Sequence, residues 1–137
     1  MTDRSAPWAP RLLSLLRIVA ALLFMEHGLM KLFHFPAPHP GVPDPLPPLL
    51  VAAVCLEAAG GLLMLLGLFT RPVAFILSGE MAIGYFIAHA PRSPWPAINQ
   101  GDAAILFCFL FLYLVATGAG PWSLDALRRR SVPDDRA

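Results

Sequence analysis

Residues 12–33 read LLSLLRIVAALLFMEHGLMKLF and are apolar almost throughout. The hydrocarbon core of a bilayer is about 30 Å thick, so a helix needs about 20 mostly apolar residues to cross it. Three more such stretches follow, at about residues 46–69, 72–90 and 99–118. In lipid, the backbone groups of these non-alternating stretches can be satisfied only within helices. The sequence therefore predicts one membrane domain over residues 1–137, an all-α transmembrane four-helix bundle.

The composition supports this class. Apolar residues make up 57% of the 137 residues and charged residues only 14%, whereas soluble domains carry about 25% charged residues. A soluble enzyme, a disordered chain and a disulfide scaffold are therefore disfavoured. The net charge of +1 provides no field for nucleic acid, so no nucleic-acid partner is expected. Cys55 and Cys108 lie singly in apolar runs and indicate packing residues rather than a redox pair.

Proline and polar residues mark the predicted helix ends. Three prolines suit the first turn of a helix, namely Pro47, Pro48 and Pro72. Asn99, followed three residues later by Asp102, resembles a capping box that opens the fourth helix. Residues 34–45 are expected to form a proline-rich outer loop, and residues 125–137 a solvated tail.

Arginine placement predicts the orientation. Arginines precede or begin the first helix, lie between the second and third, and follow the fourth: Arg4, Arg11, Arg17, Arg71, Arg128, Arg129 and Arg130. The positive-inside rule then places both termini in the cytoplasm and the proline-rich loop outside. Arg17 itself is expected to extend its side chain to the cytoplasmic headgroups.

Ionisable residues within or beside the spans are the candidate functional groups: Glu26, His27, Lys31, Glu57, Glu80 and Asp102. A charge at the bilayer centre costs roughly 2.5–3.5 kcal/mol on insertion scales, so such groups should face other helices or water. With both termini inside, all six fall in the outer half of the membrane or near its midplane, as do His89 and Asn99. The cytoplasmic half is nearly purely apolar. This asymmetry predicts a polar pocket that opens outward and binds a ligand or handles protons.

Helical spacing refines the candidate pocket. His27 and Lys31 are four residues apart and share a helix face. Glu57 shares its face with a stripe that permits close helix approach, made of Ala53, Gly60, Gly61 and Met64. The loop histidines His34 and His39 are expected to be solvated, and no metal site is expected because further ligands at a useful spacing are missing.

Most candidates also have a purely structural interpretation. Glu57 and Glu80 would then be protonated and hydrogen-bonded between helices, and Lys31 would extend its ammonium to the interface. Asp102 would act only as a helix cap. His27, beside Glu26 and several residues inside its span, is the hardest to explain in this way.

Three blocks of sequence carry a resemblance to a known family. They are LLRIVAALLFMEHGLMKLF at residues 15–33, GYFIAHAPRSPWPAINQGDAAILF at 84–107 and TGAGPWSLDAL at 117–127. In order and spacing they resemble the DoxX family of small bacterial four-helix membrane proteins. This chain has Gln100, Gly101 and Asp102 where the family often has Gly-Gly-Glu, so the acid is one methylene shorter. The resemblance implies an inner-membrane protein. Some relatives are described as membrane subunits of thiosulfate:quinone oxidoreductase or of a terminal quinol oxidase, and others are linked to an oxidoreductase complex that handles oxidative stress.

The first functional hypothesis is a membrane subunit of an oxidoreductase system that contacts a quinone. The chain lacks haem, iron–sulfur and flavin motifs, so no covalently bound cofactor is expected, and a bound quinone or a protein partner would carry the electrons. Glu26 and His27 would exchange protons or contact a quinone carbonyl. Lys31 would bind an anionic group, and Glu57 and Glu80 would hold protons near the midplane.

Two other functions remain open. One is a non-catalytic assembly or scaffold subunit of a larger membrane complex, and the other is a small transporter. Besides the lipid bilayer, a protein partner or a homo-oligomer is expected. Whether the chain is an enzyme is left open.

Overall fold

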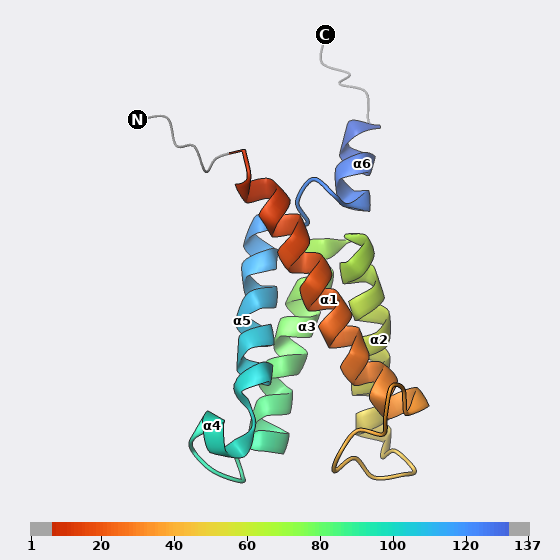
Figure 1. The fold of residues 1–137 in the computed structure, drawn as a ribbon, viewed down its shortest axis with the longest axis vertical. Coiled ribbons are helices and arrows are strands. Elements are labelled where there is room, and N and C mark those ends of the chain that lie inside the picture. The colour runs from red at the N-terminus through yellow and green to blue at the C-terminus, as the bar shows by residue number, and fades with distance from the viewer. Residues whose placement is uncertain (1–6, 132–137) are drawn as a thin grey trace.

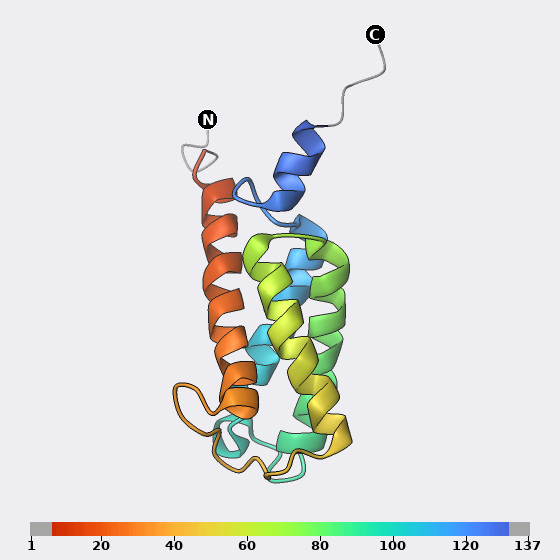
Figure 2. The same cartoon turned by 90° about the vertical axis from the view of Figure 1, so that its right-hand side faces the viewer.

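The computed structural model describes residues 7–131, and it is helical there with no β-strand. Four long helices form a bundle: α1 (Ala9–Phe33), α2 (Pro48–Leu66), α3 (Thr70–Gly84) and α5 (Asp102–Thr117). The shorter elements are a π-helical turn η1 (Tyr85–His89), α4 (Pro96–Asn99) and α6 (Leu124–Arg130). The start of α1 and all of α6 lie at one end of the bundle, which we call the α6 end. The opposite end, which we call the proline-loop end, holds helix α4 and the loop that joins α1 to α2 (Figures 1 and 2). The predicted all-α class is confirmed.

Three helical segments are long and apolar enough to cross a membrane, namely α1, α2 and the continuous stretch Thr70–His89. Helix α5 is also apolar but has 16 residues, which makes it about 24 Å long at 1.5 Å per residue. It begins at Asp102 rather than at residue 99, because the backbone of Gln100 is left-handed, with φ 60°. The expected capping box is therefore wrong. The Asn99 side chain instead accepts a hydrogen bond from the Gly101 amide at 2.8 Å.

The buried core lies between the four long helices. Its members are Ala21, Phe24, Met64, Ala74, Leu77, Phe111 and Leu114. Phe24 of α1 meets Phe111 of α5 edge-on, with ring centroids 5.0 Å apart, a favoured aromatic geometry. The predicted small-residue stripe on α2 lets its neighbours approach. A Cβ on Gly60 would lie 2.7 Å from Leu77 of α3, and one on Gly61 would overlap Met25 of α1.

Arg17 of α1 is completely buried at the α6 end. Its guanidinium donates to the carbonyl oxygens of Met64, of Leu65 at 2.6 Å, of Ala119 at 2.9 Å and of Trp122 at 2.5 Å. The last carbonyls of a helix have no partner within it, and a guanidinium offers five donors in a fixed fork. The expectation that Arg17 reaches the headgroups is therefore wrong, as is the expectation of a nearly purely apolar half at this end.

Asp125 attaches α6 to the turn between α2 and α3. Its two carboxylate oxygens accept hydrogen bonds from the backbone amides of Phe69 and Thr70, both at 2.9 Å. Partial burial raises the pKa of Asp125, but the hydrogen bonds from Thr70 and Phe69 outweigh it, and the pKa lies below its ordinary value. Arg128 lies over the Phe69 ring, 4.8 Å from its centroid. The expected solvated tail is thus a docked helix through Arg130, and residues 132–137 of that prediction lie outside the described residues.

We expect Asp125→Ala to lower the free energy of unfolding by about 1–2 kcal/mol, the usual cost of losing a helix cap. Because the pKa of Asp125 is lowered on folding, its contribution is present above the unfolded pKa of about 3.9 and is lost as the pH falls through the folded pKa. Thermal unfolding in detergent, followed by circular dichroism at neutral and acidic pH, measures both effects. Asp102→Ala is the control, because Asp102 is exposed and its side chain makes no capping bond. Equal losses for the two variants would contradict the capping role.

Candidate functional site

A buried ion pair joins α1 to α2. The Nζ of Lys31, in the last turn of α1, lies 2.5 Å from Oε1 of Glu57, midway along α2, and the two side chains are 13% and 5% exposed. Gly28, one turn before Lys31, allows this approach. A Cβ there would lie 3.1 Å from the Glu57 Cβ and 3.2 Å from the Ala58 amide nitrogen. Close packing at Gly28 therefore brings the ammonium and the carboxylate together.

Glu80 of α3 lies near this ion pair, close enough for its charge to interact with those of Glu57 and Lys31. Among the residues that the structure describes, neither carboxylate oxygen of Glu80 has a hydrogen-bond partner, and both are buried. Oε2 of Glu57 is buried and unpartnered in the same way. One ammonium thus faces two carboxyl groups, and a buried charge is costly unless it is compensated. A proton on either carboxyl group would make this cluster neutral, so it is suited to holding one.

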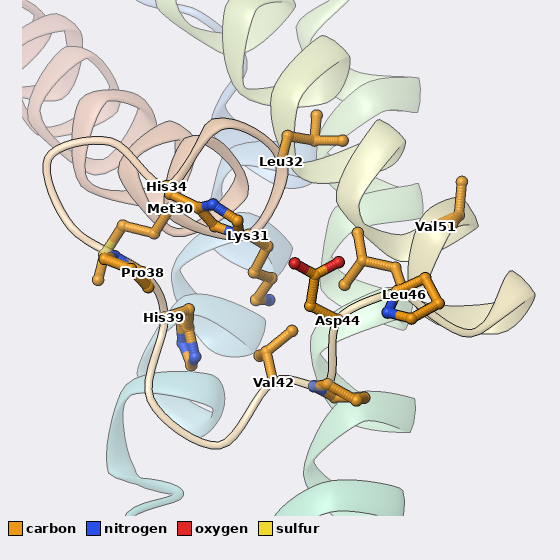
Figure 3. A pocket seen from close by; sticks show the side chains of 12 residues that line it. Met30, Lys31, Leu32, His34, Pro38, His39, Val42, Asp44, Leu46 and Val51 are labelled. Atoms are coloured by element: carbon orange, nitrogen blue, oxygen red, sulfur yellow. The ribbon is translucent and has the colours of Figure 1, made fainter.

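A cavity of about 340 Å³ lies beside the ion pair at the proline-loop end, within the size range of small-molecule pockets. Its walls are mainly apolar, with Met30, Leu32, Val42, Leu46, Val51 and several prolines. Its polar lining residues are Lys31, His34, His39 and Asp44. Figure 3 shows Lys31 reaching from α1 into the space that the loop encloses, with Asp44 beside it. Lys31 is therefore shared between the cavity and the buried carboxylates.

His39 is partly buried at this cavity, whereas the sequence predicted a solvated residue. Its Nδ1 lies 3.0 Å from the Pro40 carbonyl oxygen. Burial lowers the pKa of His39, and the charges of Lys31 and His27 act in the same direction. The Pro40 hydrogen bond and Glu57 oppose them only in part. With Nδ1–H donating to Pro40, the neutral ring offers Nε2 as a hydrogen-bond acceptor. His34 lines the same cavity but is exposed, as expected.

We expect the C2 proton of His39 to titrate below the ordinary histidine pKa of about 6.5. Because the folded pKa is the lower one, neutral His39 favours the folded loop. Its contribution is fully present above about pH 6.5 and is lost as the pH falls towards the folded pKa. Proton NMR, with His39→Asn to assign the signal, gives the pKa, and hydrogen exchange of residues 34–47 at pH 7.5 and 5.5 reports the loop. A His39 pKa at or above 6.5 would contradict the partial burial.

Three of the six candidate residues lie apart from the Lys31 cluster. Glu26 is exposed on the outside of α1. His27 is exposed too, and its Nδ1 lies 2.8 Å from the Leu23 carbonyl oxygen of its own helix. Its ring centroid lies 6.2 Å from that of His39, but His27 does not itself line the cavity. Asp102 is exposed in the first turn of α5, where a negative charge suits the helix dipole. The structure therefore brings together Lys31, Glu57 and Glu80 only.

A second polar cluster closes the loop between η1 and α5. Asn99 is buried, and its side-chain nitrogen donates to the Ser93 carbonyl at 2.8 Å and to the Tyr85 hydroxyl at 3.3 Å. Nδ1 of His89 lies 3.0 Å from the Asn99 carbonyl oxygen, and its ring stacks on Tyr85. These bonds stay within the loop and fix its path, so His89 and Asn99 have a structural role here. Over residues 7–131, no three His, Cys, Asp or Glu side chains converge as metal ligands would.

The apolar helices and the buried charge cluster define a small polytopic helical membrane protein. Residues 12–90, more than half of the chain, match the DoxX family. A Haemophilus influenzae protein, described as an uncharacterized protein, is 46% identical over 125 residues, which cover 86% of this chain and 91% of that protein. The chain therefore belongs to the DoxX family, and the resemblance seen in its sequence is confirmed. No solved structure matches it.

Proposed function

We propose that this protein is an inner-membrane subunit of an oxidoreductase system and that its proline-loop cavity binds the ring of a quinone. A quinone has an apolar ring and tail and two carbonyl oxygens that accept hydrogen bonds. The observation that carries the proposal is the shared position of Lys31. It lines an apolar-walled cavity and is paired with the buried carboxylate of Glu57. Such a cavity with a few convergent polar groups is the usual form of a ligand site.

In this proposal, each polar residue has a distinct role. Reduction of a quinone to a quinol consumes two electrons, which a partner protein supplies, and two protons. Lys31 donates a hydrogen bond to one carbonyl oxygen, and Nε2 of neutral His39 accepts a hydrogen bond from a quinol hydroxyl. Lys31 passes one proton to the carbonyl oxygen that it contacts, and Glu57 and Glu80 hold the proton that replaces it. The second proton reaches the other quinone oxygen from water through Nε2 of His39. Glu26, His27 and Asp102 have no part in this scheme because they neither line the cavity nor belong to the Lys31 cluster of Lys31, Glu57 and Glu80.

A binding titration with short-chain ubiquinone and menaquinone analogues tests this function on the purified protein in lipid nanodiscs. We expect saturable binding that Lys31→Met weakens at least tenfold and that Lys31→Arg partly preserves, because arginine keeps the donor and the charge. His39→Gln should weaken binding less. His89→Gln is the matched control, because it changes a histidine at the same end that lies outside the cavity. Undetectable binding, or equal binding by the wild type and Lys31→Met, would reject the quinone site.

The orientation in the inner membrane is part of the proposal. Most of the arginines lie at the α6 end, and the positive-inside rule assigns that end to the cytoplasm. Single cysteines placed at Gly41 and Ser131, in a Cys55→Ser, Cys108→Ser background, can be labelled in intact cells with a membrane-impermeant thiol reagent. Labelling is expected at Gly41 only. Labelling at Ser131 would invert the assignment.

An assembly role is the second candidate, and the exposed acid Glu26 on α1 favours it. A charged side chain on the outside of a bundle calls for a neighbouring protein rather than lipid. If this is the only function, Lys31→Met will lower the amount of the complex without changing its activity per molecule or its quinone content.

A further inference from the structure

The outer face of α1 carries a heptad pattern. Six residues on this face are separated by three, four or seven positions in the sequence: Leu12, Leu15, Val19, Leu22, Glu26 and Phe33. All six are exposed, the five apolar ones between 46% and 69%. Other faces of α1 pack against the rest of the bundle, because Lys31 and Gly28 contact α2 and Phe24 contacts α5. A repeat of this kind is typical of the seam between two helices that pack at a small left-handed angle.

Glu26 is the one polar residue of this seam. It lies seven residues before the end of α1 at Phe33, which is about 10 Å inside the helix. Within residues 7–131, the only ion pair is Lys31–Glu57, and no side chain hydrogen-bonds to Glu26. An acid facing lipid at this depth is costly on insertion scales. The side chain therefore requires a polar group from another helix.

We infer that a second copy of this chain covers this face, with the two α1 helices packed in parallel about a two-fold axis. In a two-fold pair each seam position meets its own equivalent. Two copies in the same membrane also share one orientation, so each apolar seam residue and each Glu26 lies at the same depth in the bilayer as its equivalent in the other copy. The two Glu26 carboxyl groups then share a proton in a hydrogen bond across the axis. A lone polar residue at such a position fixes the register and the number of strands.

Cysteine crosslinking in reconstituted bilayers tests the seam. In the Cys55→Ser, Cys108→Ser background, Val19→Cys and Leu22→Cys should form disulfide-linked dimers under mild oxidation. The matched controls, Phe75→Cys on α3 and Leu106→Cys on α5, are at least as exposed (66% and 69%) but lie away from the seam. They should crosslink at least fivefold less. Equal crosslinking at the seam and control positions would overturn the inference.

The role of Glu26 is tested by the dimer fraction, counted by single-molecule photobleaching at falling protein-to-lipid ratios. Glu26→Leu should weaken dimerisation about tenfold, consistent with the strength of polar contacts between membrane helices, and Glu26→Gln should largely keep it. Because Glu26 is exposed in the monomer, the thermal unfolding of both variants in detergent should match the wild type. A monomeric wild type, or a Glu26→Leu dimer as stable as the wild type, would overturn the inference. Neither readout depends on quinone binding.

Discussion

Arg17→Met is expected to lower the free energy of unfolding by about 3–5 kcal/mol. The substitution removes four hydrogen bonds from a charged donor and leaves the carbonyl oxygens of Leu65, Ala119 and Trp122 without this partner, while that of Met64 keeps the Gly67 amide. It also removes the cost of burying the guanidinium, so the net loss is smaller than the sum of four such bonds at about 1.5–3 kcal/mol each. These carbonyls belong to the end of α2 and to the segment after α5. The variant should therefore separate α1 from both. Thermal unfolding in detergent and the yield of folded protein measure the loss.

Two further substitutions make this result specific. Arg11→Gln changes an exposed arginine near the start of the same helix, which lies over the Trp8 ring, and its effect should stay within about 0.5 kcal/mol. Arg17→Lys keeps the charge but has a single nitrogen that cannot reach four carbonyls, so it should be intermediate. If Arg17→Met were as mild as Arg11→Gln, the buried guanidinium would not hold these segments together.

Lys31→Met and Glu57→Met are each expected to cost about 3–5 kcal/mol of unfolding free energy. Lys31→Met leaves the buried Glu57 carboxylate without a cation, and Glu57→Met removes the hydrogen-bonded partner of the Lys31 ammonium. The double variant leaves neither of these charges, so it should be more stable than the sum of the two losses predicts by at least about 2 kcal/mol. The same detergent unfolding measurement completes the double-mutant cycle.

Glu80→Gln is the control for this cycle. Within the described residues the Glu80 carboxyl makes no hydrogen bond, and the amide has nearly the same shape. No hydrogen bond is lost with this change, so the loss should stay below about 1 kcal/mol. Additive losses for Lys31 and Glu57, or a large loss for Glu80→Gln, would show that the pair is not the stabilising contact.

Hydrophobic patterning was sufficient to predict the helices and the close packing along α2. Apolar stretches of membrane-spanning length have few alternative structures in lipid. The lack of bulky side chains at Gly60 and Gly61 indicates that neighbouring helices pack close to α2. The same patterning named Lys31, Glu57 and Glu80 as candidates. It did not predict that these three meet, because helical periodicity gives the face of one helix but not its rotation relative to the next.

The partners of Arg17 could not be predicted for a different reason. They are backbone carbonyls between 47 and 105 residues away in sequence, and every residue carries such a group, so no residue type marks them. His39 and Asp44 were likewise missed as cavity residues, because the path of the proline-rich loop depends on tertiary contacts. The short helix α6 depends on one distant contact, from Asp125 to the start of α3.

The contacts of Arg17 also impose an order on biosynthesis. Helix α1 leaves the ribosome before the other helices of the bundle, yet the acceptors of its guanidinium extend to Trp122, 105 residues after Arg17. Until those residues emerge, the arginine must remain hydrated or paired with a lipid phosphate, so α1 can enter the membrane early but cannot complete its contacts. Final closure of the bundle therefore cannot precede the synthesis of Trp122, long after α1 has left the ribosome.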